Sequence, residues 1–171
     1  MKQLFSASVL IGATLVAGCI SPQRGLVLEP IGPPNVQLAR PGSNGTLVVF
    51  SAFDPHADFN DLPYLRHYTD YKISSADGTL QQTVHNNNGQ LVEGPKSLEL
   101  PVGSYRVVAH ANGYGLVTVP VVIQSNQVTI VHLEGSASWP NNAALLGSNP
   151  VRLPNGEIAG WRANTEDPTK P

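Results

Sequence analysis

The sequence predicts an all-β protein, built as a single seven-stranded antiparallel sandwich of two sheets. Between Gly45 and Glu134, short runs of β-branched and aromatic residues alternate with turn signals, and no helical period appears between them. The chain has 171 residues, which suffices for one domain but not comfortably for two. Gly (16) and Pro (15) are abundant but stay below the range of low-complexity chains, which favours a small folded β domain.

The expected strands follow one another between tight turns. Asp77-Gly78 closes the second strand, and Asn112-Gly113 ends the fifth. Pro120 has no N–H to donate to a ladder, which predicts that the sixth strand is at an edge or bulged. The seven segments are 45–53, 68–74, 79–84, 97–100, 103–111, 116–123 and 127–133.

Alternation in the fifth segment separates two faces. Tyr105, Val107 and Ala109 share one face and form the expected inward row. Arg106 and His110 lie on the other face with Val108. Apolar residues on both faces predict a central strand, or a face that is covered by the flanking segments.

The first residues predict export. Lys2 precedes an apolar stretch that is too short to span a membrane comfortably, which is typical of a signal peptide over residues 1–18. The run Leu15-Val-Ala-Gly-Cys19 resembles the lipobox of bacterial lipoproteins, and the only cysteine of the chain stands where that motif requires it. The resemblance implies that Cys19 carries acyl chains and anchors the protein in a lipid bilayer.

The residues around the predicted strands complete the domain plan. Residues 19–44 contain five prolines and are predicted to form an extended tether after the lipidated cysteine, unless Leu26–Leu28 or Val36–Leu38 adds an edge strand. Residues 45–134 form the sandwich, and 135–171 a partly disordered C-terminal extension with a small hairpin on Asn155-Gly156.

Composition excludes several classes of protein. The formal net charge of −2 leaves no basic footprint for nucleic acid. A single cysteine excludes an intramolecular disulfide and a cysteine-rich metal site. No aspartate follows Cys19, and by resemblance to lipoproteins of enteric bacteria this points to the outer rather than the inner membrane of the cell envelope.

The region 98–133 resembles the "L-P-x-G-x-Y-x-V-x-A…G-Y" block of carboxypeptidase-regulatory-like and PEGA-type domains. The matching residues are Leu100, Pro101, Gly103, Tyr105, Val107, Ala109, Gly113 and Tyr114. The resemblance implies a transthyretin-like (prealbumin-like) sandwich and an accessory role in spacing, stiffening or contact, in which none of the matched residues is catalytic. The chain departs from this family in a long insertion over residues 54–67.

The insertion holds the candidate contact and metal residues. It mixes apolar with acidic side chains, so we expect it to pack on the sandwich and to present a surface for a partner. The candidate partner-binding residues are Phe59, Tyr64, Leu65 and Tyr68. Oxygen and imidazole ligands in the same loop suit calcium or zinc, although their spacing matches no known metal loop. The candidate metal ligands are Asp54, His56, Asp58, Asp61 and His67.

Two further groups of side chains are candidates for chemistry. One candidate group is His110 and His132, which strand alternation allows to lie near one another, although strand histidines are usually ordinary surface or half-buried residues. Flat rings exposed on a sandwich would suit sugar stacking, and the alternative is that the tryptophans pin the C-terminal segment to the domain. The aromatic residues concerned are Tyr64, Tyr68, Tyr71, Trp139 and Trp161.

The sequence therefore favours a non-enzymatic, lipid-anchored protein of the cell envelope, which acts as a structural or protein-interaction module. We expect no catalytic residues, no cofactor and no resident metal, and an envelope protein or glycan as partner. The alternatives are a surface module that binds glycan or peptidoglycan, and a metal-binding protein that uses the loop 54–70.

Overall fold

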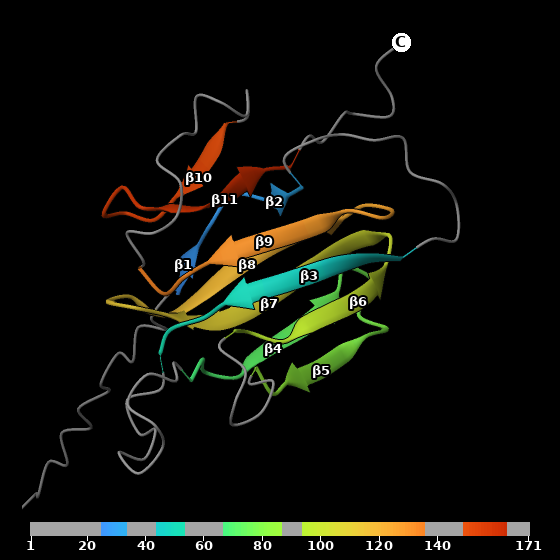
Figure 1. Cartoon of the computed structure of the whole chain (residues 1–171), viewed down its shortest axis with the longest axis horizontal. Coiled ribbons are helices and arrows are strands. Elements are labelled where there is room, and N and C mark those ends of the chain that lie inside the picture. Colours follow the sequence, from blue (N-terminus) through green and yellow to red (C-terminus); the bar gives the residue numbers. More distant parts are fainter. Residues whose placement is uncertain (1–24, 34–43, 54–66, 87–93, 136–148, 164–171) are drawn as a thin grey trace, which may run out of the picture.

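A computed structural model describes residues 25–33, 44–53, 67–86, 94–135 and 149–163 (Figure 1). These residues form eleven strands and no helix, which confirms the all-β prediction. The strands are β1 (Leu26–Val27), β2 (Ile31–Gly32), β3 (Asn44–Phe50), β4 (Tyr71–Ser75), β5 (Gln81–Val84), β6 (Ser97–Pro101), β7 (Gly103–Ala111), β8 (Gly115–Ile123), β9 (Val128–His132), β10 (Pro150–Arg152) and β11 (Ile158–Arg162). In the described part of the chain there is accordingly no helix of a length and hydropathy that would cross a membrane.

The strands form two stacked sheets, and in the view of Figure 1 the smaller sheet lies in front of the larger one. The larger sheet has eight strands in the order β10-β11-β2-β8-β7-β4-β5, with β1 also paired to β8, and the smaller sheet has the order β6-β3-β9. Each of the seven expected segments overlaps one of the strands β3 to β9, and the ends differ by a few residues.

Both sheets are mixed, which corrects the expectation of purely antiparallel pairing. Strand β3 pairs in parallel with β9, and β8 pairs in parallel with β1 and β2. Parallel neighbours are joined by long connections instead of tight turns, so turn signals in the sequence do not reveal them. The remaining pairs are antiparallel, and the longest is the hairpin of β7 and β8.

The core lies between the sheets and follows the alternation of each strand. Leu47 and Val49 of β3 are fully buried and face Val107 and Val119 of the larger sheet. The predicted inward row of β7 is confirmed: Tyr105 is 8% exposed, and its hydroxyl donates a hydrogen bond to the carbonyl of Pro101 at 2.8 Å.

The N-terminal segment enters the fold earlier than the tether interpretation predicts. Residues 25–33 lie along β8, with Leu26 opposite Val117 and Ile31 opposite Val121. Leu28 and Ile31 are part of the core. The alternative of an added strand at Leu26–Leu28 is therefore the one that the structure shows, since among the described strands β1 pairs only with β8, and β2 follows it at an interior position between β8 and β11. Val36–Leu38 lies outside the described residues.

Strand β8 is interior and keeps continuous register with β7, so the prediction of an edge or a bulge at Pro120 is wrong. On its other side β1 ends at Val27, opposite Thr118, and β2 begins at Ile31, opposite Val121. Pro120 lies between these two pairs, where neither strand needs its missing N–H.

The C-terminal hairpin predicted on Asn155-Gly156 is confirmed as β10 and β11. Gly156 has a φ of 90°, the left-handed conformation that glycine adopts at little cost. Gly160 is buried so tightly that a Cβ there would lie 2.7 Å from Ile31 Cγ2 and 3.0 Å from the Ile130 carbonyl oxygen. Strands β2, β10 and β11 thus close the sandwich along one margin, which we call the closed side. Two parts of the predicted C-terminal extension, residues 136–148 and 164–171, lie outside the described residues.

Candidate functional site

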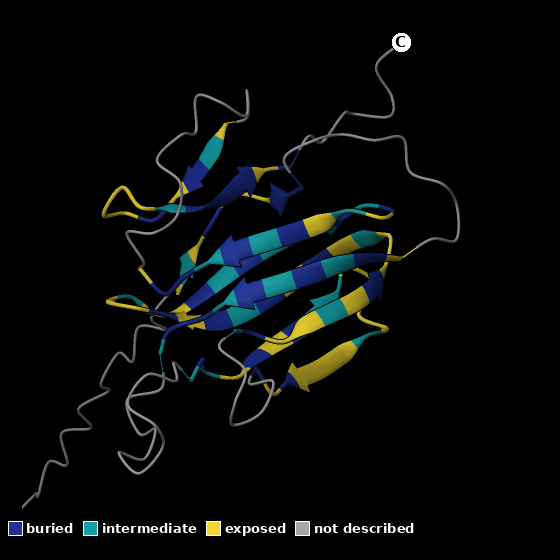
Figure 2. Cartoon of the chain, viewed as in Figure 1, coloured by how far each residue is buried: buried dark blue, intermediate teal, exposed yellow. Residues whose placement is uncertain are grey.

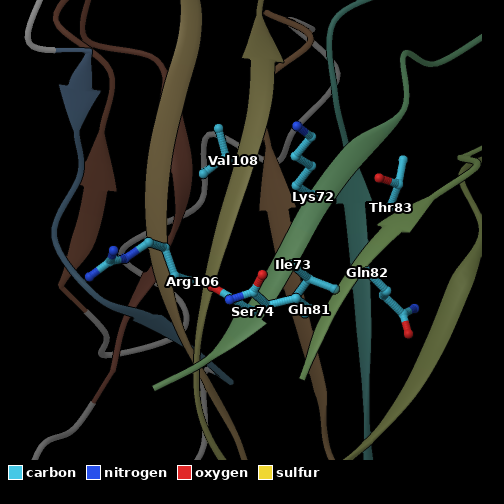
Figure 3. A pocket seen from close by; sticks show the side chains of 8 residues that line it. All are labelled: Lys72, Ile73, Ser74, Gln81, Gln82, Thr83, Arg106 and Val108. Atoms are coloured by element: carbon cyan, nitrogen blue, oxygen red, sulfur yellow. The ribbon is translucent and has the colours of Figure 1, made fainter. Parts of the chain in front are cut away.

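The candidate site is a hollow on the outer face of the larger sheet, over β4, β5 and β7 (Figure 3). Its volume is about 500 Å³. It lies at the β5 margin of the sheet, which we call the open side. The hollow is lined by Lys72, Ile73, Ser74, Gln81, Gln82, Thr83, Arg106 and Val108.

Strand alternation places the polar side chains here. Tyr71 and Ile73 of β4 are buried in the core, so Lys72 and Ser74 project from the opposite face. Ser74 stands directly between Gln81 of β5 and Arg106 of β7 in the register of the three strands. Because serine is the smallest of these side chains, the floor of the hollow is low at that point.

Lys72 and Arg106 make the hollow cationic. Both are exposed, and neither forms an ion pair with any residue that the structure describes. None of the eight lining residues is acidic. Positive charge is therefore concentrated on this face although the whole chain has a net charge of −2.

The carboxylates at the two ends of β4 are engaged in hydrogen bonds of their own. Asp70 lies 2.7 Å from His85 Nδ1 and accepts a hydrogen bond from the Asn86 backbone N–H at 3.0 Å. Hydrogen bonds from Ser75 and from Thr79 lower the pKa of Asp77, which keeps this carboxylate ionised in its turn. Both carboxylates are thus held by neighbours at the ends of β4, and among the described residues neither forms an ion pair with Lys72 or Arg106.

A buried polar network holds the margin beside the hollow. Asn86 is fully buried at the end of β5, and its side-chain amide donates to the Val49 carbonyl at 2.8 Å and to Ser51 Oγ at 2.9 Å. Ser51 Oγ in turn donates to the Thr69 carbonyl at 2.6 Å. These bonds connect the chain just after β5 to the smaller sheet, so they hold the open side in place where β5 ends.

Most of the residues predicted from the insertion lie outside the described part of the chain. These are Asp54, His56, Asp58, Phe59, Asp61, Tyr64 and Leu65. Tyr68 is described and is 7% exposed, with its ring against Phe50 and Phe53 at centroid distances of 5.6 and 5.3 Å. It therefore fixes the end of the insertion to the core, and its ring does not form an exposed contact surface.

The two strand histidines do not meet. His110 projects from the outer face of the larger sheet, and His132 from the outer face of the smaller sheet. His132 stacks on Phe50 with 4.4 Å between ring centroids, and its Nδ1 lies 2.7 Å from a carboxylate oxygen of buried Glu134. This pair secures the end of β9.

Among the described residues, no three His, Cys, Asp or Glu side chains gather in a way that would hold a metal ion, and of the metal candidates only His67 is described.

The expected sugar-stacking aromatics are largely in the core. Tyr68, Tyr71 and Trp161 are 7%, 2% and 4% exposed, while Tyr64 and Trp139 lie outside the described residues. Trp161 sits in β11, in agreement with the alternative that it pins the C-terminal segment. Stacking on the three described rings is thereby excluded as a way to hold a sugar.

Comparison with known proteins adds no relative. No family model, no curated protein and no solved structure matches the chain.

The hollow itself was not among the sites predicted from the sequence. The available signal was a cation at an outward position of each of two strands, Lys72 and Arg106, but their proximity depends on the pairing of β4 with β7.

Proposed function

We propose that the protein is a non-enzymatic, lipid-anchored protein of the cell envelope that acts as a structural or protein-interaction module. The observation that carries the proposal is the only cysteine, Cys19, placed at the end of an apolar segment and after the small residues Ala17 and Gly18. Acylation of this thiol would hold the β domain at an outer-membrane surface.

The distance from anchor to domain supports a module that works close to the bilayer. Only residues 20–24 separate Cys19 from Gly25, where the described fold begins. Even a fully extended chain of this length spans only about 20 Å. The start of β1 would thus lie within that distance of the lipid surface, nearer than a tether over residues 19–44 would place it.

The fold that we propose for the central region is a transthyretin-like sandwich enlarged at one margin. Strands β3 to β9 supply seven strands in two layers, as the resemblance to the carboxypeptidase-regulatory-like and PEGA-type domains implies. Strands β1, β2, β10 and β11 are additions to this set, and β2, β10 and β11 build the closed side. Domains of this kind serve as rigid spacers and contact modules.

Replacement of the anchor residue tests the proposal. In a bacterial host, the wild-type chain should be processed, labelled by a radioactive fatty acid, and recovered with outer membranes on a density gradient. The Cys19→Ala variant should lose the label and remain unprocessed or soluble, while Ser21→Ala serves as a matched control and behaves as wild type. Equal membrane recovery and equal mass of Cys19→Ala and wild type would refute lipid anchoring.

The alternative of a glycan-binding surface module has one specific observation in its favour, the cationic hollow with its polar lining. It is compatible with lipid anchoring, because an anchored module needs a partner.

A further inference from the structure

We propose that the hollow over β4 is a binding site for an acidic glycan, with Lys72 and Arg106 recognising its carboxylate or phosphate groups. This ligand would be the partner of the interaction module, so the proposal rests on the proposed function for its setting. Binding in solution does not need the lipid anchor, however, and the two ideas therefore fail separately.

The charge of the hollow selects an anion. Two cations without an ion-pair partner in the described residues face solvent across a surface that has no acidic lining residue. The guanidinium of Arg106 presents a planar fork that fits a carboxylate or phosphate with two hydrogen bonds, and the ammonium of Lys72 acts as a compact point charge. Their separate charges are complementary to acidic groups on a ligand.

The positions of the two cations favour a ligand with more than one acidic group. Lys72 is level with Thr83 and Val108, whereas Arg106 is level with Ser74 and Gln81, as Figure 3 also shows. Two residues along a strand correspond to about 7 Å. The Arg106 side chain extends away from Ser74 and Gln81 in Figure 3, so the two cations are separated across the strands as well as along them, an arrangement suited to a linear chain with acidic groups on separate units.

The uncharged lining favours hydroxyl-bearing ligands. Ser74 and Thr83 carry hydroxyls and Gln81 carries an amide, and each of these groups can donate as well as accept a hydrogen bond. Neighbouring hydroxyls of a sugar ring also donate and accept, so they pair well with such side chains. Val108 supplies an apolar contact for the face of a ring.

The floor of the hollow disfavours an extended acidic peptide. Strand β4 is paired with β5 on one side and with β7 on the other, so its backbone N–H and carbonyl groups are engaged within the sheet. A peptide in the hollow would gain no main-chain hydrogen bonds there, which are the main source of affinity when a strand is added to a sheet. Over β4, recognition must therefore come from side chains, as in glycan binding, whereas β5, the last strand of the described sheet, is paired on one side only.

Titration of the full-length protein, purified in non-ionic detergent, with oligogalacturonate of about ten units tests the proposal. The fully methyl-esterified oligomer has the same backbone without the charge and is the ligand control. We expect binding of the acid form that weakens with salt, and at least about tenfold weaker binding of the ester, because the ester has no carboxylates to form charge-assisted hydrogen bonds with the two cations.

Charge-removing variants localise the binding. Lys72→Gln and Arg106→Gln should each weaken binding of the acid oligomer by about three- to tenfold, and the double variant by more than about tenfold. Lys96→Gln removes the same charge from an exposed lysine outside the hollow and should change affinity less than about twofold. Because Lys72 and Arg106 are exposed, all variants should keep the wild-type melting temperature, which is measured in parallel.

Several results would overturn the proposal. These are no binding of the acid oligomer, equal binding of acid and ester, unchanged affinity of the double variant, or an equal loss with Lys96→Gln. Binding to phosphatidylglycerol vesicles that depends on Lys72 and Arg106, without binding to the oligomer, would assign the hollow to a lipid surface and likewise contradict the glycan assignment.

Discussion

The two margins of the larger sheet differ in burial and in chemistry (Figure 2). On the closed side, both residues of β2 and three of the five residues of β11 are buried, and Ile31 and Ala159 have no exposed surface. On the open side, three of the four residues of β5 are exposed and polar, and the cationic hollow lies beside them. The closed side of the sheet thus contributes mainly to the core, and the open side forms a solvated polar surface.

This difference indicates a division of tasks within one domain. The closed side joins segments from both ends of the described chain, because β2 pairs with β11, and it excludes water from the space between the sheets. Side chains there contribute to stability through burial. Lys72 and Arg106 in the hollow are exposed to solvent, so their charges are available to a ligand. Substitutions at the two margins should therefore have different consequences.

The largest effect is expected from Ile31→Ala on the closed side. Removal of a fully buried side chain should lower the free energy of unfolding by about 2–5 kcal/mol, measured by urea denaturation. Val27→Ala in the neighbouring strand is the control and should change it by less than about 1 kcal/mol, since Val27 is 64% exposed. Equal small effects would mean that this segment is only a tether.

A polar substitution tests whether the open side is anchored by the buried network. Asn86→Ala removes side-chain hydrogen bonds to Val49, to Ser51 and from the Lys96 backbone N–H. We expect a loss of about 2–4 kcal/mol in the free energy of unfolding, at about 1 kcal/mol per bond and more for groups left unsatisfied. His85→Ala, next in sequence, should lose less than about 0.5 kcal/mol because its ion pair is solvent-exposed. If Asn86→Ala lowers the free energy of unfolding no more than His85→Ala does, the buried network does not stabilise the open side.

Gly160 tests the close approach of backbones on the closed side. Gly160→Ala should destabilise the protein by about 1–3 kcal/mol, because the new Cβ would meet Ile31 and the Ile130 carbonyl. Gly94→Ala, where nothing lies within 4 Å of the new Cβ, should stay within about 0.5 kcal/mol of wild type. If Gly160→Ala unfolds at the wild-type denaturant concentration, the packing of β11 on β2 is looser than described.

The sandwich should lose stability in alkali through its buried tyrosines. Burial raises the pKa of Tyr71, and burial together with the Asp77 carboxylate raises the pKa of Tyr105. The folded protein therefore keeps these phenols protonated at a pH where the unfolded chain releases the protons. Their contribution is fully present below pH about 10 and declines above it, by up to about 1.4 kcal/mol per pH unit for each tyrosine. Free energies of unfolding between pH 8 and 11 should show this decline, and Tyr71→Phe should reduce its slope; an identical slope in that variant would contradict the explanation.

The sequence predicted the strands far better than their partners. Turn signals such as Asp77-Gly78 and Asn155-Gly156 are local, so the hairpins that they close were foreseen. The pairing of Thr46 with Val128 and of Ile31 with Val121 is non-local and parallel, and no local pattern encodes it. The density of proline around Ile31 also hid a core segment, because Pro30 and Pro33 flank a strand of only two residues.

The hollow escaped prediction for the same reason. Arg106 and Lys72 were visible as outward residues of separate strands, but only the register of β4 with β7 brings them to one surface. Tyr68 and Tyr71, in contrast, were considered as exposed rings, but the structure places both in the core. The sequence pattern beside a long insertion does not distinguish an aromatic ring that packs in the core from one that is exposed.

Amide hydrogen exchange, recorded with and without oligogalacturonate, tests the division of tasks most directly. Without ligand, β2 and β11 should exchange as slowly as the central strands β7 and β8, and β5 should exchange faster. Addition of the oligomer should slow exchange in β4 and β5 and leave β2 and β11 unchanged. Rapid exchange in β2 and β11, or ligand protection confined to the closed side, would contradict the account.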